Sequence, residues 1–176
     1  MNKLFRRLTA LLVISAAFMA ARSSTSGQSQ NSTAERSKFL GTWKLLSTEE
    51  KLKDGSVRPY KFVGAHGLGY LMYAADGHMC AELMSVDRAR WDDPPTPAQK
   101  IAAIDGLAAY CGRFEIDEAN HVMWHYPEVA WMPNYVGRKE PRPYRMVDNR
   151  LIFSGKGTKE DDDDVERWTV VWEKVK

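Results

Sequence analysis

The stretch FLGTWKLLS, residues 39–47, begins a run of segments in which every second side chain falls on the same face. Trp43, Leu45 and Ser47 share one face of the expected strand, because side chains alternate between the two faces of a sheet. A second aromatic strand, RWTVVWEKV at 167–175, lies at the far end of the chain. If the first and last strands are neighbours, the sheet closes on itself, so this arrangement predicts a closed barrel.

The middle of the chain holds two further strand signals. In LGYLMYAADGHMCAELM, residues 68–84, an Asp-Gly pair at 76–77 predicts the tight turn of an antiparallel hairpin. In YCGRFEID, residues 110–117, Tyr110 and Phe114 share one face while charged residues occupy the other. Both segments favour an antiparallel sheet.

One helix is expected over residues 97–110. Apolar residues recur there at helical spacing, Thr96 can act as the N-cap, and Pro97 occupies the first helical position. With the strands, this favours an all-β fold class, an antiparallel barrel or sandwich. Of the two we expect a closed antiparallel up-and-down barrel of about eight strands with one short α-helix, since a barrel leaves no sheet edge exposed. A barrel of that size either fills its interior with side chains or encloses one small ligand.

The first residues of the chain differ from the rest. A basic start, the short apolar run at 8–21 and a polar, small-residue stretch after it have the layout of a secretory signal. We expect residues 1–27 to be the signal segment, 28–37 a disordered leader and 38–176 the barrel domain. The protein is therefore expected to be secreted or periplasmic, and not membrane-bound once the signal is cleaved.

The charge balance argues against a nucleic-acid partner. The chain has 25 basic and 23 acidic residues, a formal net charge of +2. Four of the basic residues, Lys3, Arg6, Arg7 and Arg22, lie in the expected signal, so the remainder has 21 basic and 23 acidic residues and a net charge of −2. Nucleic-acid binding needs a clustered basic face, and the sequence gives no sign of one.

The two cysteines are expected to be free thiols. If the strand at 78–84 pairs with 110–117, Cys80 lies beside a residue near Phe114, about 10 Å along the strand from Cys111. A disulfide needs Cα atoms within about 7 Å of each other. Export to an oxidising compartment would favour a disulfide, so it opposes the argument from the strand register.

Five segments, taken together, carry a resemblance to a known family. They are FLGTWKLLS, GYLMYAADGHMCAEL, YCGRFEID, HYPEVAWMPNYVGRKEPRPYRMVDNRLIFS and WTVVWEKV. Their order and spacing resemble the bacterial and fungal lipocalin-like domains over residues 39–175. The resemblance implies that Gly41 and Trp43 close the floor of the barrel, with Arg167 of the last strand stacked on Trp43. Alternatively, Trp43 is ordinary core and Arg167 is a surface residue.

The resemblance also implies a binding site for a small, largely apolar molecule. His125, Asn134 and Arg142 match positions that the family tends to keep polar, and they could orient a ligand carboxylate or carbonyl. Alternatively, His125 caps a backbone carbonyl and Arg142 pairs with a glutamate at the rim. The face of the His125 strand that points inward is left open. The expected inner wall consists of Tyr110, Phe114, Tyr144 and Met146.

No metal or cofactor is expected. His121 and His125 would lie about 13 Å apart along one strand, too far to bind one ion together, and the acidic run 161–164 is read as a solvated loop. Nucleophile and dinucleotide motifs do not occur. Two alternatives to a binding protein stay open: an isomerase or cyclase with His125 as acid or base, and a filled barrel that acts through its surface.

Overall fold

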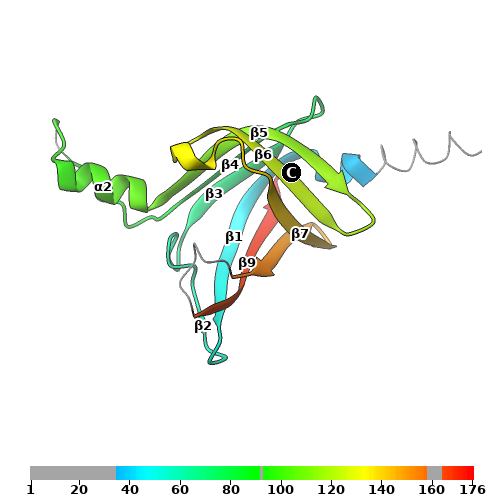
Figure 1. Ribbon diagram of the computed structural model, residues 1–176, viewed down its shortest axis with the longest axis horizontal. Helices are drawn as coiled ribbons and strands as arrows, with labels where there is room; N and C mark the ends of the chain where they lie inside the picture. Colours follow the sequence, from blue (N-terminus) through cyan, green and yellow to red (C-terminus); the bar gives the residue numbers. More distant parts are fainter. Residues whose placement is uncertain (1–34, 92, 158–163) are drawn as a thin grey trace, which may run out of the picture. The chain divides into compact units, whose positions relative to one another are not determined.

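The computed structural model describes residues 35–91, 93–157 and 164–176 (Figure 1). The expected signal segment and most of the expected leader lie outside these residues, but residues 35–39 are helical and belong to the same compact unit as the barrel. The strands are β1 (Gly41–Leu52), β2 (Val57–Arg58), β3 (Leu68–Tyr73), β4 (His78–Met84), β5 (Leu107–Asp117), β6 (Val122–Ala130), β7 (Glu140–Val147), β8 (Arg150–Lys156) and β9 (Val165–Lys174), with the helix α2 (Pro97–Asp105) and the 3-10 turn η1 (Pro133–Tyr135).

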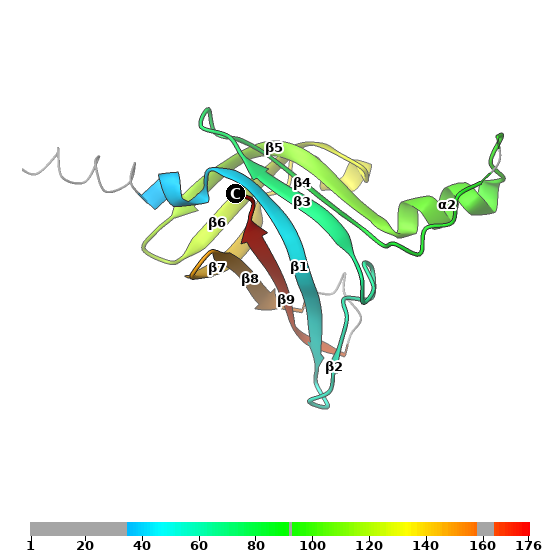
Figure 2. The same cartoon turned by 180° about the vertical axis from the view of Figure 1, so that it is seen from behind.

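The strands form one antiparallel sheet that closes on itself. Their order is β2-β1-β3-β4-β5-β6-β7-β8-β9, and β1 also pairs with β9. That pairing runs from Trp43 opposite Lys174 to Leu52 opposite Val165, and Figure 2 shows β9 beside β1. The predicted closed barrel is therefore confirmed: eight strands form the cylinder, and the short β2 is an additional strand on β1.

Strand β1 carries an irregularity that the alternating pattern did not reveal. Its register against β9 shifts between Leu45 and Ser47, which is a β-bulge. Trp43 and Leu45 are buried before the shift, and Thr48 and Glu50 are buried after it. Ser47, expected on the same face as Trp43, is exposed instead, because the extra residue reverses the faces.

The floor of the barrel is built around Trp43, which is fully buried. Its indole Nε1 donates a hydrogen bond to the Phe39 carbonyl at 2.8 Å, so the helical segment before β1 covers this end. The ammonium of Lys174 lies 5.2 Å from the centroid of the Trp43 ring and donates to the Lys38 carbonyl at 2.8 Å. Gly41 has a φ of +113°, a conformation that favours glycine.

The predicted stack of Arg167 on Trp43 is wrong. Arg167 is exposed and pairs in register with Lys51, near the other end of β1. The reason is the antiparallel direction of the two strands. The start of β1 meets the end of β9, so the cation beside Trp43 comes from the last residue of the strand, Lys174.

The helix begins where the sequence predicts. The Thr96 side chain accepts from the Gln99 amide, and the Gln99 side chain accepts from the Thr96 amide, which together form a capping box. The helix ends at Asp105, five residues before the expected end, and none of its residues is buried. Strand β5 accordingly begins at Leu107.

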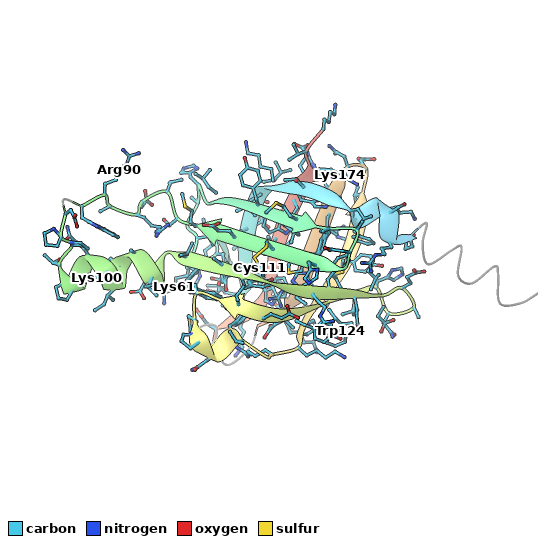
Figure 3. All side chains as sticks on the ribbon, turned by 90° about the horizontal axis from the view of Figure 1, so that it is seen from above. Lys61, Arg90, Lys100, Cys111, Trp124 and Lys174 are labelled. Atoms are coloured by element: carbon cyan, nitrogen blue, oxygen red, sulfur yellow. A yellow bond between two sulfur atoms is a disulfide. The ribbon has the colours of Figure 1, made fainter. Side chains whose placement is uncertain are left out.

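The expectation of two free cysteines is also wrong. Cys80 and Cys111 form a disulfide and are direct register partners, with Cα atoms 4.1 Å apart (Figure 3). The expected register placed Cys80 near Phe114 because it started the strand at Tyr110. The actual start at Leu107 moves the pairing by three residues and brings the two sulfur atoms together.

We predict that Trp43 and Lys174 stabilise the fold jointly. In a double-mutant cycle with Trp43→Leu and Lys174→Met, the coupling free energy should be about 0.5–1 kcal/mol, because the cation interacts with the indole face. The measurement is the free energy of unfolding in urea. Arg167→Met is the control and should show no coupling with Trp43→Leu; additive effects of the Lys174 pair would contradict the prediction.

Candidate functional site

The barrel encloses a cavity of about 500 Å³, within the range of small-molecule sites in proteins. Its wall is largely apolar, and the apolar residues that the strands contribute come from five of them. The apolar lining includes Leu71 of β3, Ala81 and Leu83 of β4, Ala108 of β5, Phe153 of β8, and Val170 and Trp172 of β9. Aromatic side chains from two connecting segments complete it, namely Tyr60, Phe62, Trp131 and Tyr135.

His125 points into the barrel from β6. Met123, His125 and Pro127 are the buried residues of this strand, while Trp124 and Tyr126 on the other face are only partly buried. This settles which face is inner, a point that the sequence left open. With 1% of its surface exposed, His125 is among the most deeply buried polar residues of the described chain.

Two tyrosines hold the His125 ring. The Tyr73 hydroxyl, from β3, lies 2.6 Å from Nε2, and the Tyr110 hydroxyl, from β5, lies 2.8 Å from Nδ1. Burial, and secondarily the charge of Arg142, lowers the pKa of His125 well below its ordinary value. The ring is therefore neutral at pH 7, with one nitrogen donating and the other accepting.

Arg142 of β7 supplies a fixed positive charge at the cavity. Its Nη2 donates to the Tyr135 hydroxyl at 2.6 Å, and its Nη1 donates to the Glu140 carboxylate at 3.2 Å. Burial lowers the pKa of Arg142, but the oxygens of Tyr110, Tyr135 and Glu140 raise it by more, so the guanidinium stays protonated. Burial likewise raises the pKa of Tyr135, which stays a neutral phenol.

Glu140 is engaged by two cations. Besides its bond with Arg142, its carboxylate pairs with Arg138, with Nε and Oε1 3.0 Å apart. Both arginines and Glu140 line the cavity. With His125 neutral, these described ionisable groups give the lining a net charge of +1.

Two hydrogen-bond donors that are unpaired within the described part of the chain also lie at the cavity. Trp131 and Trp172 belong to the lining, and their indole N–H groups are buried without a partner among the described residues. The hydroxyl of Thr169 adds a further polar group. The main acceptor, the Glu140 carboxylate, already receives two arginines.

The structure brings some of the predicted site residues together and separates others. Tyr110, His125 and Arg142 line the cavity. Phe114, Tyr144 and Met146 belong to the apolar core but not to the described lining. Tyr144 packs edge-on against Phe39, with ring centroids 4.9 Å apart, which places it at the floor.

Asn134 is not brought to the cavity. It lies in the turn η1 and is exposed, and its neighbour Tyr135 is the residue that reaches the lining. The alternative interpretation of Arg142, that it pairs with a glutamate, is confirmed, and the glutamate is Glu140. The alternative reading of His125, a bond to a backbone carbonyl, is wrong, because both its partners are tyrosine hydroxyls.

Sequence reasoning missed Tyr73, Tyr135 and Glu140. A signal for Tyr73 was present, since it falls on the same face as the buried Leu71 in the alternating strand β3. Tyr135 and Glu140 lie at an irregular turn and at the start of the strand that follows it, where no periodic pattern indicates the direction of a side chain.

The described residues hold neither a metal-binding cluster nor a membrane-crossing helix. They contain no group of three or more His, Cys, Asp or Glu side chains placed to hold a metal ion. No helix within these ranges is long and apolar enough to cross a membrane.

Comparison with known proteins identifies a family. A family model described as a lipocalin-like domain matches residues 40–175, a range that includes all the barrel strands. A search of the curated proteins gave no match.

We predict that His125 makes the protein less stable in mild acid. Below about pH 6.5 the unfolded chain binds a proton at this residue, whereas the folded protein, with its lowered pKa, does not. Stability should therefore fall as the pH falls from 6.5 to 5, by up to about 1.4 kcal/mol per pH unit. The measurement is the urea unfolding free energy across this range.

His125→Gln should flatten this slope, whereas His66→Gln, at an exposed position, should keep it. An equal slope in the wild type and in His125→Gln would show that folding does not shift the pKa of His125.

Proposed function

The chain belongs to the lipocalin-like domain family, and we propose that it is an exported barrel that binds a small, largely apolar molecule in its interior. The observation that carries this proposal is the cavity of about 500 Å³ with an apolar wall and a few convergent polar groups. Sites of this kind bury most of a small ligand and use the polar groups to orient it.

The energetics favour an apolar guest. Each Å² of apolar surface removed from water contributes about 25 cal/mol, so a ligand that buries about 200 Å² gains about 5 kcal/mol before the cost of lost motion. Aromatic residues such as Phe62 and Trp131, whose ring centroids are 6.4 Å apart, present flat apolar faces to it.

Direct acid–base chemistry by His125 is not part of this proposal. Both ring nitrogens are already bonded to tyrosine hydroxyls, and burial keeps the ring neutral by lowering its pKa. His125 instead holds the Tyr110 hydroxyl in place at the cavity wall, which is consistent with a binding site.

Export is supported by two independent features. The first residues have the charge and hydropathy layout of a secretory signal. The Cys80–Cys111 disulfide fits an oxidising compartment, since disulfides persist outside the cytosol. We therefore propose that the mature protein is secreted or periplasmic.

Protein isolated from its own host should test export. We expect N-terminal sequencing to give a mature start after the apolar run and before Glu35. Mass spectrometry without reductant should find Cys80 and Cys111 unalkylated and the mass two hydrogens lower than that of the dithiol. A chain that starts at Met1 with two alkylated thiols would contradict export.

Filling the cavity should abolish binding. Ala108 lines the cavity, whereas Ala109 is on the opposite face of β5. Ala108→Phe should weaken binding of N-phenyl-1-naphthylamine, an uncharged apolar fluorophore, about tenfold or more, because the new ring occupies the ligand's space. The measurement is fluorescence titration, with thermal unfolding as a check of folding.

The matched control is Ala109→Phe, which should bind the fluorophore as the wild type does. If Ala108→Phe binds equally well, or if the wild type shows no saturable single site, the cavity is not the binding site.

A further inference from the structure

The polar corner of the cavity consists of Tyr110, Tyr135 and Arg142, with Glu140 beside them. Arg142 donates to Tyr135 and also forms a side-chain hydrogen bond with Tyr110. The two tyrosines are close neighbours, with ring centroids 5.2 Å apart. What this corner can bind depends on where the two phenolic protons point.

The buried Tyr73 decides the direction of the first proton. Its hydroxyl has one hydrogen-bond partner within the described chain, Nε2 of His125. A buried O–H donor left without an acceptor is costly, whereas an unused lone pair costs less. Tyr73 therefore donates to Nε2, and Nε2 carries no proton.

The tautomer of His125 follows from that bond. A neutral imidazole with an unprotonated Nε2 carries its proton on Nδ1, so Nδ1 donates to the Tyr110 hydroxyl. The Tyr110 oxygen thus accepts from His125 and from Arg142. Its own proton has no acceptor among the described residues and is directed into the cavity that Tyr110 lines.

Tyr135 is in the same situation. Its oxygen accepts from Nη2 of Arg142 at 2.6 Å, and no described residue accepts its proton. Two phenolic donors and one guanidinium therefore converge on one corner. The net charge of +1 on the described ionisable lining favours a group that brings a negative charge.

We propose that this corner binds the carboxylate of an amphipathic ligand whose apolar part fills the rest of the cavity. Hydrogen bonds from hydroxyls to a carboxylate are short and strong, and a carboxylate has enough lone pairs to accept from both hydroxyls. The Nη groups of Arg142 already donate to Glu140, to the Pro141 carbonyl and to Tyr135, so the guanidinium contributes its positive charge beside the carboxylate. The inference rests on the proposed binding function and adds the chemical class of the ligand. Tyr73 and His125 act as positioning residues, because they orient the Tyr110 hydroxyl without being its ligand contact.

Calorimetric titration with a matched pair of probes, decanoate and 1-decanol, tests this at pH 7. The two probes share their apolar chain. The affinity for 1-decanol therefore reports the contribution of the apolar wall, and the ratio of the two affinities reports the contribution of the polar corner. We expect decanoate to bind about tenfold more tightly or better. Equal binding would overturn the carboxylate site and leave the proposed function standing, whereas binding of neither probe would overturn both.

Variants locate the effect. Tyr110→Phe should lower the affinity for decanoate about tenfold and change that for 1-decanol less than twofold. Tyr126→Phe is the matched control: it is next to His125 on the outer face of β6, and its hydroxyl donates to Glu115, so both affinities should be unchanged. A preference for decanoate that survives in Tyr110→Phe would show that this hydroxyl does not bind the ligand.

The tautomer can be tested without any ligand. Nitrogen-15 NMR of the wild type should show His125 protonated at Nδ1 and unprotonated at Nε2. A wild-type spectrum with the proton on Nε2 would overturn the orientation of Tyr110.

Discussion

The hydrogen bonding of β1 to β9 is the constraint on which the rest of the structure depends. These strands come from the two ends of the domain, and their pairing turns a sheet into a cylinder without exposed edges. The pairing begins at Trp43 and Lys174, where an indole, an ammonium and two backbone carbonyls close the floor. One end of the barrel is sealed in this way, and the interior holds a cavity of about 500 Å³.

Much of the fold followed from local sequence signals. The Asp-Gly turn joined β3 to β4 as expected, with Gly77 at φ +98°, and Thr96 with Pro97 marked the start of α2. The strand register did not follow from such signals, since alternation does not say where a strand begins. An error of three residues at the start of β5 was enough to separate two cysteines that are bonded. The bulge after Leu45 was equally invisible, because the bulged residues keep an ordinary strand composition.

The limits of the alternating pattern also explain why only part of the candidate site could be predicted. Alternation tells which face of a strand a residue occupies, but not how far along the barrel it lies. Phe114 and Tyr144 do point inward, yet they pack in the core at the floor, whereas Tyr110, four residues before Phe114 on β5, reaches the cavity. The side-chain directions of residues outside the regular strands, such as Asn134 and Tyr135, could not be predicted, because an irregular turn has no periodic sequence pattern.

The disulfide between β4 and β5 has a consequence for how a guest exchanges with solvent. Neighbouring residues of the same two strands, Ala81 and Tyr110, line the cavity, so a covalent bond keeps this part of the wall from parting. Trp43 and Phe39 block the opposite extremity from the aromatic segments. Phe62 and Trp131 line the cavity from the two connecting segments. A guest that enters between these segments would have to displace their side chains, and the rate of that movement would limit its exchange with solvent.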